Sequence, residues 1–159
     1  MIVATTEELK IIYEEDQKDR EGGPDNIDWE KLKISDEKRL AKVKELYSQG
    51  FIKTSEDMFY AAMIFQHGKT PENLKIAMEL AKKSWKLGNS DGKWLYPRAE
   101  DRYLLSINKA QIWGTQYIRE KSNEPWRLQE PFDKATKTEK ERKEMGIDIE
   151  AKLKKLNYS

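Results

Sequence analysis

The stretch that decides the fold is Asp57–Gly68, DMFYAAMIFQHG, near the middle of the chain. Its apolar residues occur almost all the way round a helical turn, the pattern of a helix that is enclosed by protein on all sides. Thr54 supplies a capping oxygen before the stretch, and the glycine at its end stops the helix. The stretch ends on Gln66 and His67, the only histidine in the chain. We therefore expect other helices to pack around it and polar residues to gather at its end.

Start and stop signals divide the flanking sequence into further helices. Capping residues followed by acidic residues predict the starts, and glycines predict the ends. The predicted helices cover residues 6–20 (capped by Thr5 or Thr6), 36–49, 55–67, 71–87 and 90–107. Residues 21–35 are predicted to be a loop with Trp29 as its apolar anchor and at most a short helical turn at residues 29–33. Pro97 lies inside the last helix and predicts a kink or a break there.

Tight glycine turns join the helices between residues 36 and 107, which predicts antiparallel helical hairpins. The segment Leu80–Tyr96, LAKKSWKLGNSDGKWLY, resembles the helix–turn–helix unit of Sel1-like and tetratricopeptide (TPR) proteins. Only one such unit is visible, and a solenoid needs about three repeats to be stable. The resemblance therefore implies TPR-like hairpin packing and not a repeat protein, and the expected fold class is all-α.

The character of the sequence changes after Asn108. Residues 115–119 and 126–128 are expected to pair as a short β-hairpin or to remain irregular, since two short strands alone are marginal. A polar tail with two short helices of mixed charge begins at Pro131. We treat residues 1–159 as a single domain, in which 131–159 is a polar C-terminal helical extension packed on the edge of the bundle.

Composition excludes several classes of function. Of the 159 residues, 30 are basic and 29 acidic, so no net field attracts nucleic acid or anionic lipid. The absence of cysteine removes disulfides, thiolate catalysis and cysteine-based zinc sites. We see no signal peptide, and no segment approaches the roughly 20 apolar residues of a membrane span. We therefore expect a cytoplasmic protein with no nucleic-acid or membrane partner; the oligomeric state stays open.

His67, Asp101 and Asp16 are the candidate catalytic residues. His67 is the one side chain here that exchanges protons near neutral pH without a large shift in pKa. A lone histidine at a helix end is more often structural, since the negative end of the helix dipole stabilises its protonated form. Both interpretations stay open.

The two aspartates each have a structural alternative. Asp101 falls on the apolar face of its helix, where it needs a donor because an unpaired buried charge is unfavourable. An ion pair with Arg20 or Lys93 explains it as well as a functional site does. Asp16 extends the apolar stripe of the first helix, and a frayed, hydrated helix end is the favoured interpretation, because carboxylates are rarely fully buried.

A second set of polar residues provides the candidate substrate-binding residues. Arginines suit an anionic group, and a loop with an aromatic ring, a flexible backbone and two hydrogen-bonding side chains is a frequent ligand contact. The alternative for that loop is a strand start whose side chains satisfy nearby backbone. The set comprises Arg20, Gln66, Arg102, Trp113, Thr115 and Gln116. Apart from Trp113, we expect these residues and the candidate catalytic residues to converge in one pocket, closed by the Gly114–Gln116 loop.

Other cofactor and metal chemistry has little support. The sequence contains no GxGxxG or GxxxxGK[ST] motif, so nothing favours a nucleotide-binding fold. One histidine without cysteine makes a zinc site improbable, and an oxygen-rich site is conceivable but weakly supported. Its ligands would be drawn from Asp16, Asp19, Asp57, Asp101 and His67. We expect no metal and no cofactor.

The polar motifs in their order resemble those of a widespread bacterial family of unknown function. They are DxxDR, the DMFYAAMIFQHG helix, an LG turn, EDRYL, GTQ and a WxL segment, and they cover about residues 8–130. The family positions matched here are Asp16, Asp19, Arg20, Gln66, His67, Gly68, Trp94, Asp101, Arg102, Gln111, Gly114, Thr115 and Gln116. The chain departs from the family pattern in the segment KWLYPRAEDRYL, where the family resemblance leads us to expect an alanine near the position of Pro97. The resemblance implies a real site but brings no activity or cofactor with it.

These observations favour a small-molecule or peptide-modifying enzyme that uses acid–base chemistry. In this hypothesis Asp101 or Asp16 positions or deprotonates the substrate, and His67 carries the proton. Arg102 or Arg20 holds an anionic group of the substrate. One alternative is a helical protein- or peptide-interaction module that binds a segment in a groove between hairpins. Another is a structural or immunity-type partner protein.

Overall fold

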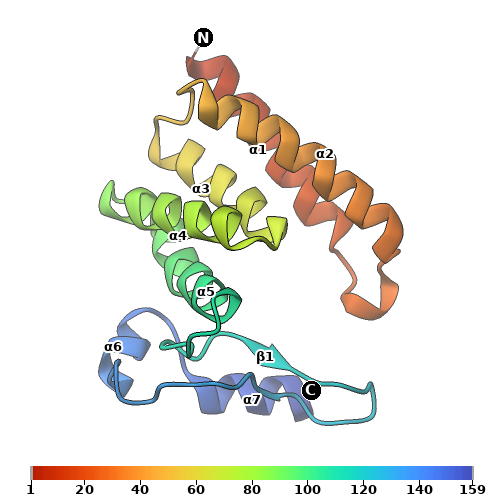
Figure 1. Cartoon of the computed structure of the whole chain (residues 1–159), viewed down its shortest axis with the longest axis vertical. Coiled ribbons are helices and arrows are strands. Elements are labelled where there is room, and N and C mark those ends of the chain that lie inside the picture. The colour runs from red at the N-terminus through yellow and green to blue at the C-terminus, as the bar shows by residue number, and fades with distance from the viewer. Residues whose placement is uncertain (1, 159) are drawn as a thin grey trace.

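The structure is a computed structural model that describes residues 2–158 (Figure 1). Within this range the chain is mostly helical, with one long irregular segment between α5 and α6, and the predicted all-α fold class is confirmed. The helices are α1 (Ile2–Asp19), α2 (Trp29–Ser48), α3 (Ser55–Phe65), α4 (Pro71–Lys86), α5 (Ser90–Ser106), α6 (Glu139–Glu144) and α7 (Ile149–Tyr158). Two short 3-10 turns, η1 (Pro24–Asn26) and η2 (Gln66–Gly68), and two strands, β1 (Tyr117–Ile118) and β2 (Arg127–Leu128), complete it.

The central helix α3 is held as its composition predicts. Thr54 accepts a hydrogen bond from the amide of Asp57, whose side chain binds back to the cap in a capping box. Its apolar residues are buried on every side, among them Ala61–Phe65. α1, α2, α4 and α5 all pack against it. The main hydrophobic core is therefore built around α3.

α4 and α5 form the closest helical hairpin. Thr70 and Asn89 cap them as predicted, and the two helices contact each other more extensively than any other pair. Gly92 makes this approach possible, because a Cβ atom there would collide with Ser84 and the backbone of Trp85. α5 runs through Pro97 as one helix, so the predicted break does not occur.

The first two helices begin earlier than the sequence predicted. α1 starts at Ile2 and α2 at Trp29, so residues 29–35 are helical and Thr5 and Thr6 are not caps. Asp28 caps α2 by accepting from the Lys31 amide, and no glycine or proline interrupts the helix up to Ser48. Trp29 is not an anchor, since 59% of its surface is exposed.

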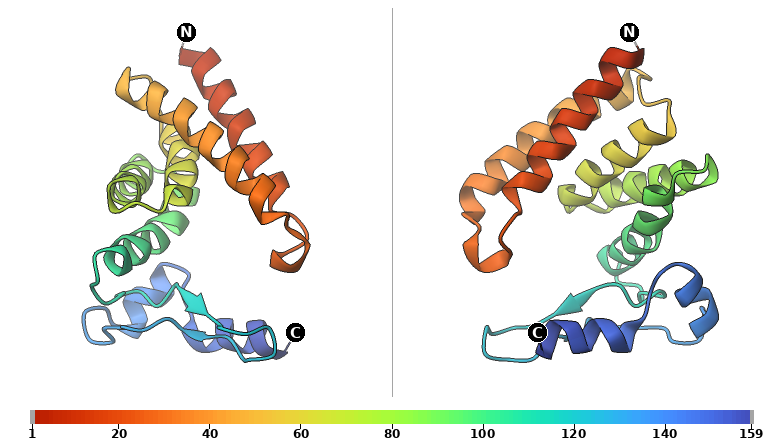
Figure 2. Two further views of the ribbon diagram at one scale, coloured as in Figure 1. Left: turned by 45° about the vertical axis from the view of Figure 1, so that its right-hand side comes forward. Right: turned by 180° about the vertical axis from the view of Figure 1, so that it is seen from behind.

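The helices form layers, as Figures 1 and 2 show from three sides. α1 and α2 lie side by side and pack against α3, which α4 also contacts. α5 lies beyond α4, and the strands, α6 and α7 form a separate layer at the far end. No helix among the described residues is both long and apolar enough to cross a lipid bilayer.

The C-terminal layer has a small hydrophobic core of its own. β1 and β2 pair antiparallel, with Tyr117 opposite Leu128, as the sequence predicted for a short hairpin. Trp113, Met145 and Ile147 are buried together there. Gly114 adopts φ of +79°, and a Cβ atom at this position would collide with the Ile149 side chain. The tail thus packs closely on the Gly114–Gln116 loop and contributes apolar contacts of its own.

Candidate functional site

The end of α1 carries an ion-pair network. Asp16 is almost fully buried, and its carboxylate lies 2.5 Å from Arg20 and 3.8 Å from Arg39. Arg39 also pairs with Asp19 at 2.8 Å and with Asp36 at 2.9 Å. The favoured interpretation of Asp16 as a hydrated helix end is therefore wrong. Its closest cationic partner is Arg20, which directly follows the same helix. The second, Arg39, comes from α2, approaches to 3.8 Å without a hydrogen bond and could not be read from the local sequence.

The network satisfies its own charges. Burial disfavours ionisation of Asp36, but hydrogen bonds from Arg20 and Arg39 outweigh it and lower the pKa of that carboxyl. Burial likewise opposes the charge of Arg39, yet hydrogen bonds with Asp19 and Asp36 raise its pKa. Arg20 binds Asp16 through one terminal nitrogen and Asp36 through the other. Arg20 is thus engaged within the protein and is not available as the main anion holder.

His67 lies at the edge of this network. It sits in η2, where the chain turns sharply because Lys69 takes φ of 59° and Asn73 donates to the Gly68 carbonyl. The His67 Nε2 atom is buried and lies 3.3 Å from the Asp16 carboxylate, while 16% of the side chain remains exposed. The exposed part of the ring is therefore away from Nε2. Asp16 and His67 form the only close contact between two candidate catalytic residues within residues 2–158.

Asp101 belongs to a second cluster, in which it holds a loop. It has no exposed surface, and one carboxylate oxygen accepts from the amides of Ile112 and Trp113 at 2.8 and 3.0 Å. The other accepts from the amide and the hydroxyl of Thr115 at 3.0 and 2.7 Å. Burial raises the pKa of Asp101, against these hydrogen bonds, which lower it. The expected ion pair with Arg20 or Lys93 is absent among the described contacts.

Gln111 completes the loop and was not among the candidate site residues. Its fully buried amide donates to the carbonyls of Gln116 and Gln129, and its oxygen accepts from the amides of Thr115 and Gln116. Two sequence signals point to Gln111: it precedes a glycine-containing loop, and it is one of the positions that carry the family resemblance. Backbone partners of this kind cannot be located from residue spacing.

Trp113 lies inside this loop, but its ring points away from the open cavities. The ring packs in the C-terminal core, and its Nε1 donates to Glu100 at 2.8 Å. Its observed role is to anchor the loop.

Two arginines on α5 contrast with the network on α1. Arg98 donates to the Trp94 carbonyl, and Arg102 donates through Nε to Gln116 at 3.2 Å. Neither forms an ion pair with any carboxylate in the described part of the chain. Burial lowers the pKa of Arg102, and the positive charge of Arg20 lowers it further. Burial also lowers the pKa of Arg98, partly offset by Tyr117 and Asp101.

Two open cavities flank these groups. The first, here called the His67 cavity, has a volume of about 400 Å³. Its lining comprises Arg20, Trp29, Leu32, Lys33, Asp36, Glu37, Leu40, Gln66, His67, Gly68, Lys69 and Arg102. The second, here called the α5–α7 cavity, has a volume of about 620 Å³. Its lining comprises Gln66, Trp94, Leu95, Arg98, Arg102, Gly114–Tyr117, Gly146–Asp148, Ala151, Lys152 and Lys155.

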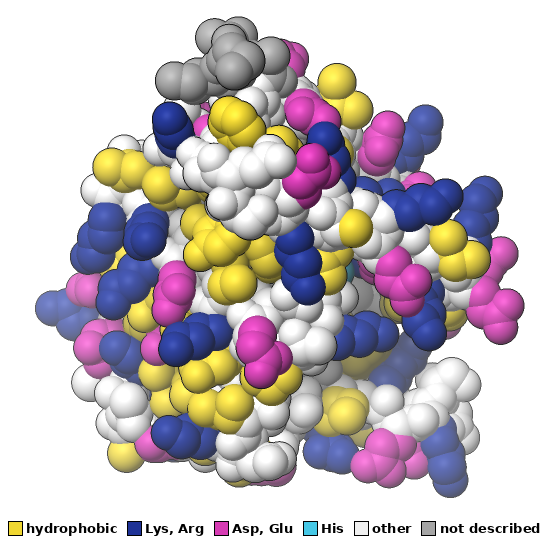
Figure 3. Space-filling view, turned by 45° about the horizontal axis from the view of Figure 1, so that its top comes forward, with side chains coloured by type: hydrophobic (Ala, Val, Ile, Leu, Met, Phe, Trp, Pro, Cys, Tyr) yellow, Lys and Arg dark blue, Asp and Glu magenta, His cyan; other side chains and the backbone are white. Residues whose placement is uncertain are grey.

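The predicted site residues thus fall into two neighbouring clusters and not into one pocket. Asp16, Arg20 and His67 make up the first, and Asp101, Arg102, Thr115, Gln116 and Trp113 make up the second. Gln66 and Arg102 line both cavities and connect the two clusters. Figure 3 shows Lys and Arg side chains around the hollow on the right of the view, between the helical layers and the C-terminal layer.

No group of three or more histidine, aspartate or glutamate side chains in residues 2–158 is arranged to hold a metal ion. Asp57, one of the conceivable oxygen ligands, instead binds Thr6 and the amides of residues 53 and 54. Comparison of the chain with protein-family models, with curated proteins and with solved structures found no match. Function must therefore be argued from the site itself.

Proposed function

We propose that the chain is an enzyme that binds a small anionic molecule in the His67 cavity. His67 takes a proton from one atom of this molecule and returns it to another. One observation supports this most directly. His67, whose Nε2 lies 3.3 Å from the buried carboxylate of Asp16, lines the same cavity as Arg102, a guanidinium without a carboxylate partner among the described residues. A proton carrier and an uncompensated cation on one cavity are the two parts that such an enzyme needs.

The geometry gives each residue a separate role. Nε2 of His67 lies 3.3 Å from Asp16 without forming a hydrogen bond; in a neutral ring whose Nε2–H turns towards Asp16, Nδ1 has no proton and is able to accept one. Asp16 is then a positioning residue, and its own charge is balanced by Arg20 and Arg39. Asp101 is also a positioning residue, because both its oxygens already accept hydrogen bonds from the loop that it holds.

Arg102 is the proposed anion-binding residue. A guanidinium has five N–H donors, and only the Nε of Arg102 binds a described protein group, the Gln116 side chain. Its two terminal nitrogens suit the paired oxygens of a carboxylate or phosphate. An anion there would also relieve the repulsion between Arg102 and Arg20.

The test is a thermal-shift screen of anionic metabolites on the wild type, His67→Gln and Arg102→Gln, followed by assay of the hits for turnover. We expect a ligand to raise the Tm of the wild type and of His67→Gln by several degrees but not that of Arg102→Gln. Turnover should be lost in both variants. Failure of every anion to stabilise the wild type contradicts the proposal.

A peptide-binding module is the second candidate. Trp29 lines the His67 cavity with 59% of its surface exposed, and Leu32 and Leu40 of the same helix line it too. Aromatic and aliphatic side chains beside a groove are common in peptide-binding sites. Three results together would favour this module or an immunity-type partner. Ligands would stabilise His67→Gln and the wild type equally, neither protein would turn over any ligand, and the chain would capture a protein partner.

The wider context is part of the same proposal. We propose a cytoplasmic bacterial protein with TPR-like hairpins that is related to the family of unknown function resembled by residues 8–130. In support, most of the polar positions that carry this resemblance take part in the two clusters of the site. Comparison with the sequences of relatives would test this relationship: we expect the polar positions of the two clusters to change together from one relative to the next.

A further inference from the structure

The α5–α7 cavity is a basic cavity that the proposed proton transfer does not use. Four of its lining side chains are basic, Arg98, Arg102, Lys152 and Lys155, and one is acidic, Asp148. Lys155 already has an interaction partner, so the excess of charge is carried by Arg98, Arg102 and Lys152. The chain as a whole is nearly neutral, with 30 basic and 29 acidic residues. The excess of positive charge is thus a local property of this cavity. Concentrated positive charge in a recess attracts anionic ligands.

Arg98 and Arg102 are the core of this charge. They lie one helical turn apart on α5, so their side chains emerge on the same face. Like charges at this spacing repel each other, and partial burial adds a desolvation cost. Elsewhere in the fold, buried Arg39 is compensated by three carboxylates. The α5 pair forms no ion pair within residues 2–158. Arg98 donates to the Trp94 carbonyl and stacks on the Trp94 ring at 4.2 Å, so a bound anion would be the first carboxylate- or phosphate-type partner of either guanidinium.

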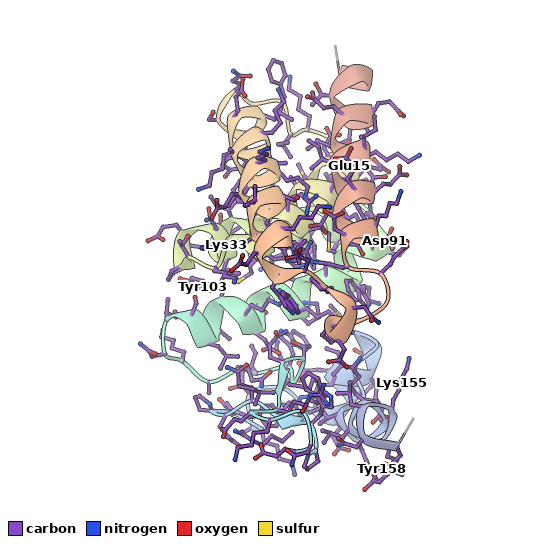
Figure 4. The ribbon with its side chains drawn as sticks, turned by 90° about the vertical axis from the view of Figure 1, so that its right-hand side faces the viewer. Glu15, Lys33, Asp91, Tyr103, Lys155 and Tyr158 are labelled. Atoms are coloured by element: carbon purple, nitrogen blue, oxygen red, sulfur yellow. The ribbon has the colours of Figure 1, made fainter. Side chains whose placement is uncertain are left out.

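The position of the cavity relates it to His67. Gln66 and Arg102 line both cavities, so the two meet at these side chains. Figure 4 shows Lys33, which lines the His67 cavity, and Lys155, which lines the α5–α7 cavity, on opposite sides of α5. A molecule that contacts Arg102 can therefore extend from one cavity into the other.

We infer that the ligand of this protein is an elongated small molecule with two anionic groups, one beside His67 and the second between α5 and α7 at Arg98 and Lys152. This inference rests on the proposed function for the first group. Volumes of about 400 and 620 Å³ are adequate for a small ligand of this kind. Phosphate and carboxylate groups share the chemistry that guanidinium and ammonium recognise, so the test separates them.

Isothermal titration calorimetry provides the test, with phosphate, pyrophosphate, tripolyphosphate and unbranched dicarboxylates of increasing length as probes. We expect a two-anion probe of sufficient length to bind at least about tenfold more tightly than a single anion, because a second ion pair forms. The series whose affinity rises more steeply with probe length, phosphate or carboxylate, identifies the class of anion that the protein binds. Equal affinity across both series would overturn the inference.

Variants assign the second group to its cavity. Lys152→Gln is the main variant, because its exposed side chain is not needed for folding, and Lys154→Gln is its matched control on the outer side of α7. We expect Lys152→Gln and Arg98→Gln each to weaken the long probe about tenfold and to leave phosphate binding unchanged. Lys154→Gln should behave as the wild type.

The outcomes separate this inference from the proposed function. Binding of single anions that depends on Arg102 but not on probe length, Arg98 or Lys152 overturns the inference and leaves the proposed function standing. Equal weakening by Lys152→Gln and Lys154→Gln also overturns it, since the effect would then be one of general surface charge. Binding of no probe at all contradicts both.

Discussion

Arg39 and Arg102 are both enclosed by the helical fold, but their surroundings are opposite. Arg39 joins α2 to α1 through Asp19 and Asp16, at 2.8 and 3.8 Å, and pairs with Asp36 of its own helix at 2.9 Å. Arg102 binds one neutral side chain and faces the charge of Arg20. The same residue type thus acts as a cross-link in one region and remains uncompensated in the other. A fold that neutralises one arginine so fully and leaves another unpaired points to a ligand for the second.

The directions of the pKa shifts agree with this contrast. For both residues burial is the largest cause and lowers the pKa. At Arg39 the hydrogen bonds with Asp19 and Asp36 reverse the effect and raise its pKa. At Arg102 the charge of Arg20 adds to the effect, so its pKa stays lowered. Removal of the two side chains should therefore change stability in different directions.

Arg39→Met should have the largest effect on stability. It removes the cation paired with Asp19 and leaves Asp16 and Asp36 with Arg20 as their arginine partner, and removal of one partner from a buried ion pair costs about 3–5 kcal/mol. Urea denaturation of this variant and of the exposed neighbour Lys38→Met measures the difference. A loss of less than about 1 kcal/mol would mean that the network adds little to the fold.

Asp101→Asn should come next. The amide group of asparagine would point N–H donors at the donors of Thr115 or of residues 112 and 113, and each such mismatch costs about 1–3 kcal/mol. We expect faster hydrogen exchange over residues 111–116 and a lower Tm. Asp91→Asn, in the exposed first turn of the same helix, is the control. Unchanged exchange in the loop would show that its geometry does not depend on the Asp101 carboxylate.

Arg102→Met should change stability little or increase it by up to about 1 kcal/mol, because it removes an uncompensated charge and replaces it by an apolar chain. Urea denaturation alongside Arg39→Met makes the contrast quantitative. Equal destabilisation by the two substitutions would show that Arg102 also has a structural partner, and the comparison between the two regions would then fail.

The pH dependence should show the smallest effect. The pKa of Asp36 is lowered in the folded state, so its contribution is fully present above its unfolded value of 3.8 and is lost as the pH falls through the lower folded value. Asp36→Asn should therefore flatten the loss of stability below about pH 4, by about 1 kcal/mol or less. Unfolding curves between pH 2 and about 6 measure it, and an unchanged acid limb would argue against the pairing.

The sequence predicted local features well and long-range partners poorly. Caps at Thr54, Thr70 and Asn89 and the enclosure of α3 follow from residue type and helical period, and the structure confirms them. The predicted helix at residues 36–49 began too late. Ser35 followed by Asp36 and Glu37 has the sequence of a helix cap, although these residues lie inside the continuous helix α2.

The candidate site shows the same limit. Its polar residues stood out because they occupy positions where apolar ones are expected, but spacing along one helix does not identify a partner on another. Asp16 was therefore interpreted as a hydrated helix end, although Arg20 directly after its own helix and, at a longer distance, Arg39 of α2 compensate its charge. Asp101 is satisfied by backbone amides of a distant loop, which carry no sequence signature. The division into two clusters around Arg102 could be found only in three dimensions.

The most direct test of the central claim is differential scanning calorimetry of the wild type and Arg102→Met with and without pyrophosphate. The account predicts that pyrophosphate raises the Tm of the wild type by several degrees and leaves that of Arg102→Met unchanged, while the two proteins have similar Tm values without it. An equal rise in both proteins, or no rise in the wild type, would contradict the claim that Arg102 is kept unpaired for an anionic ligand.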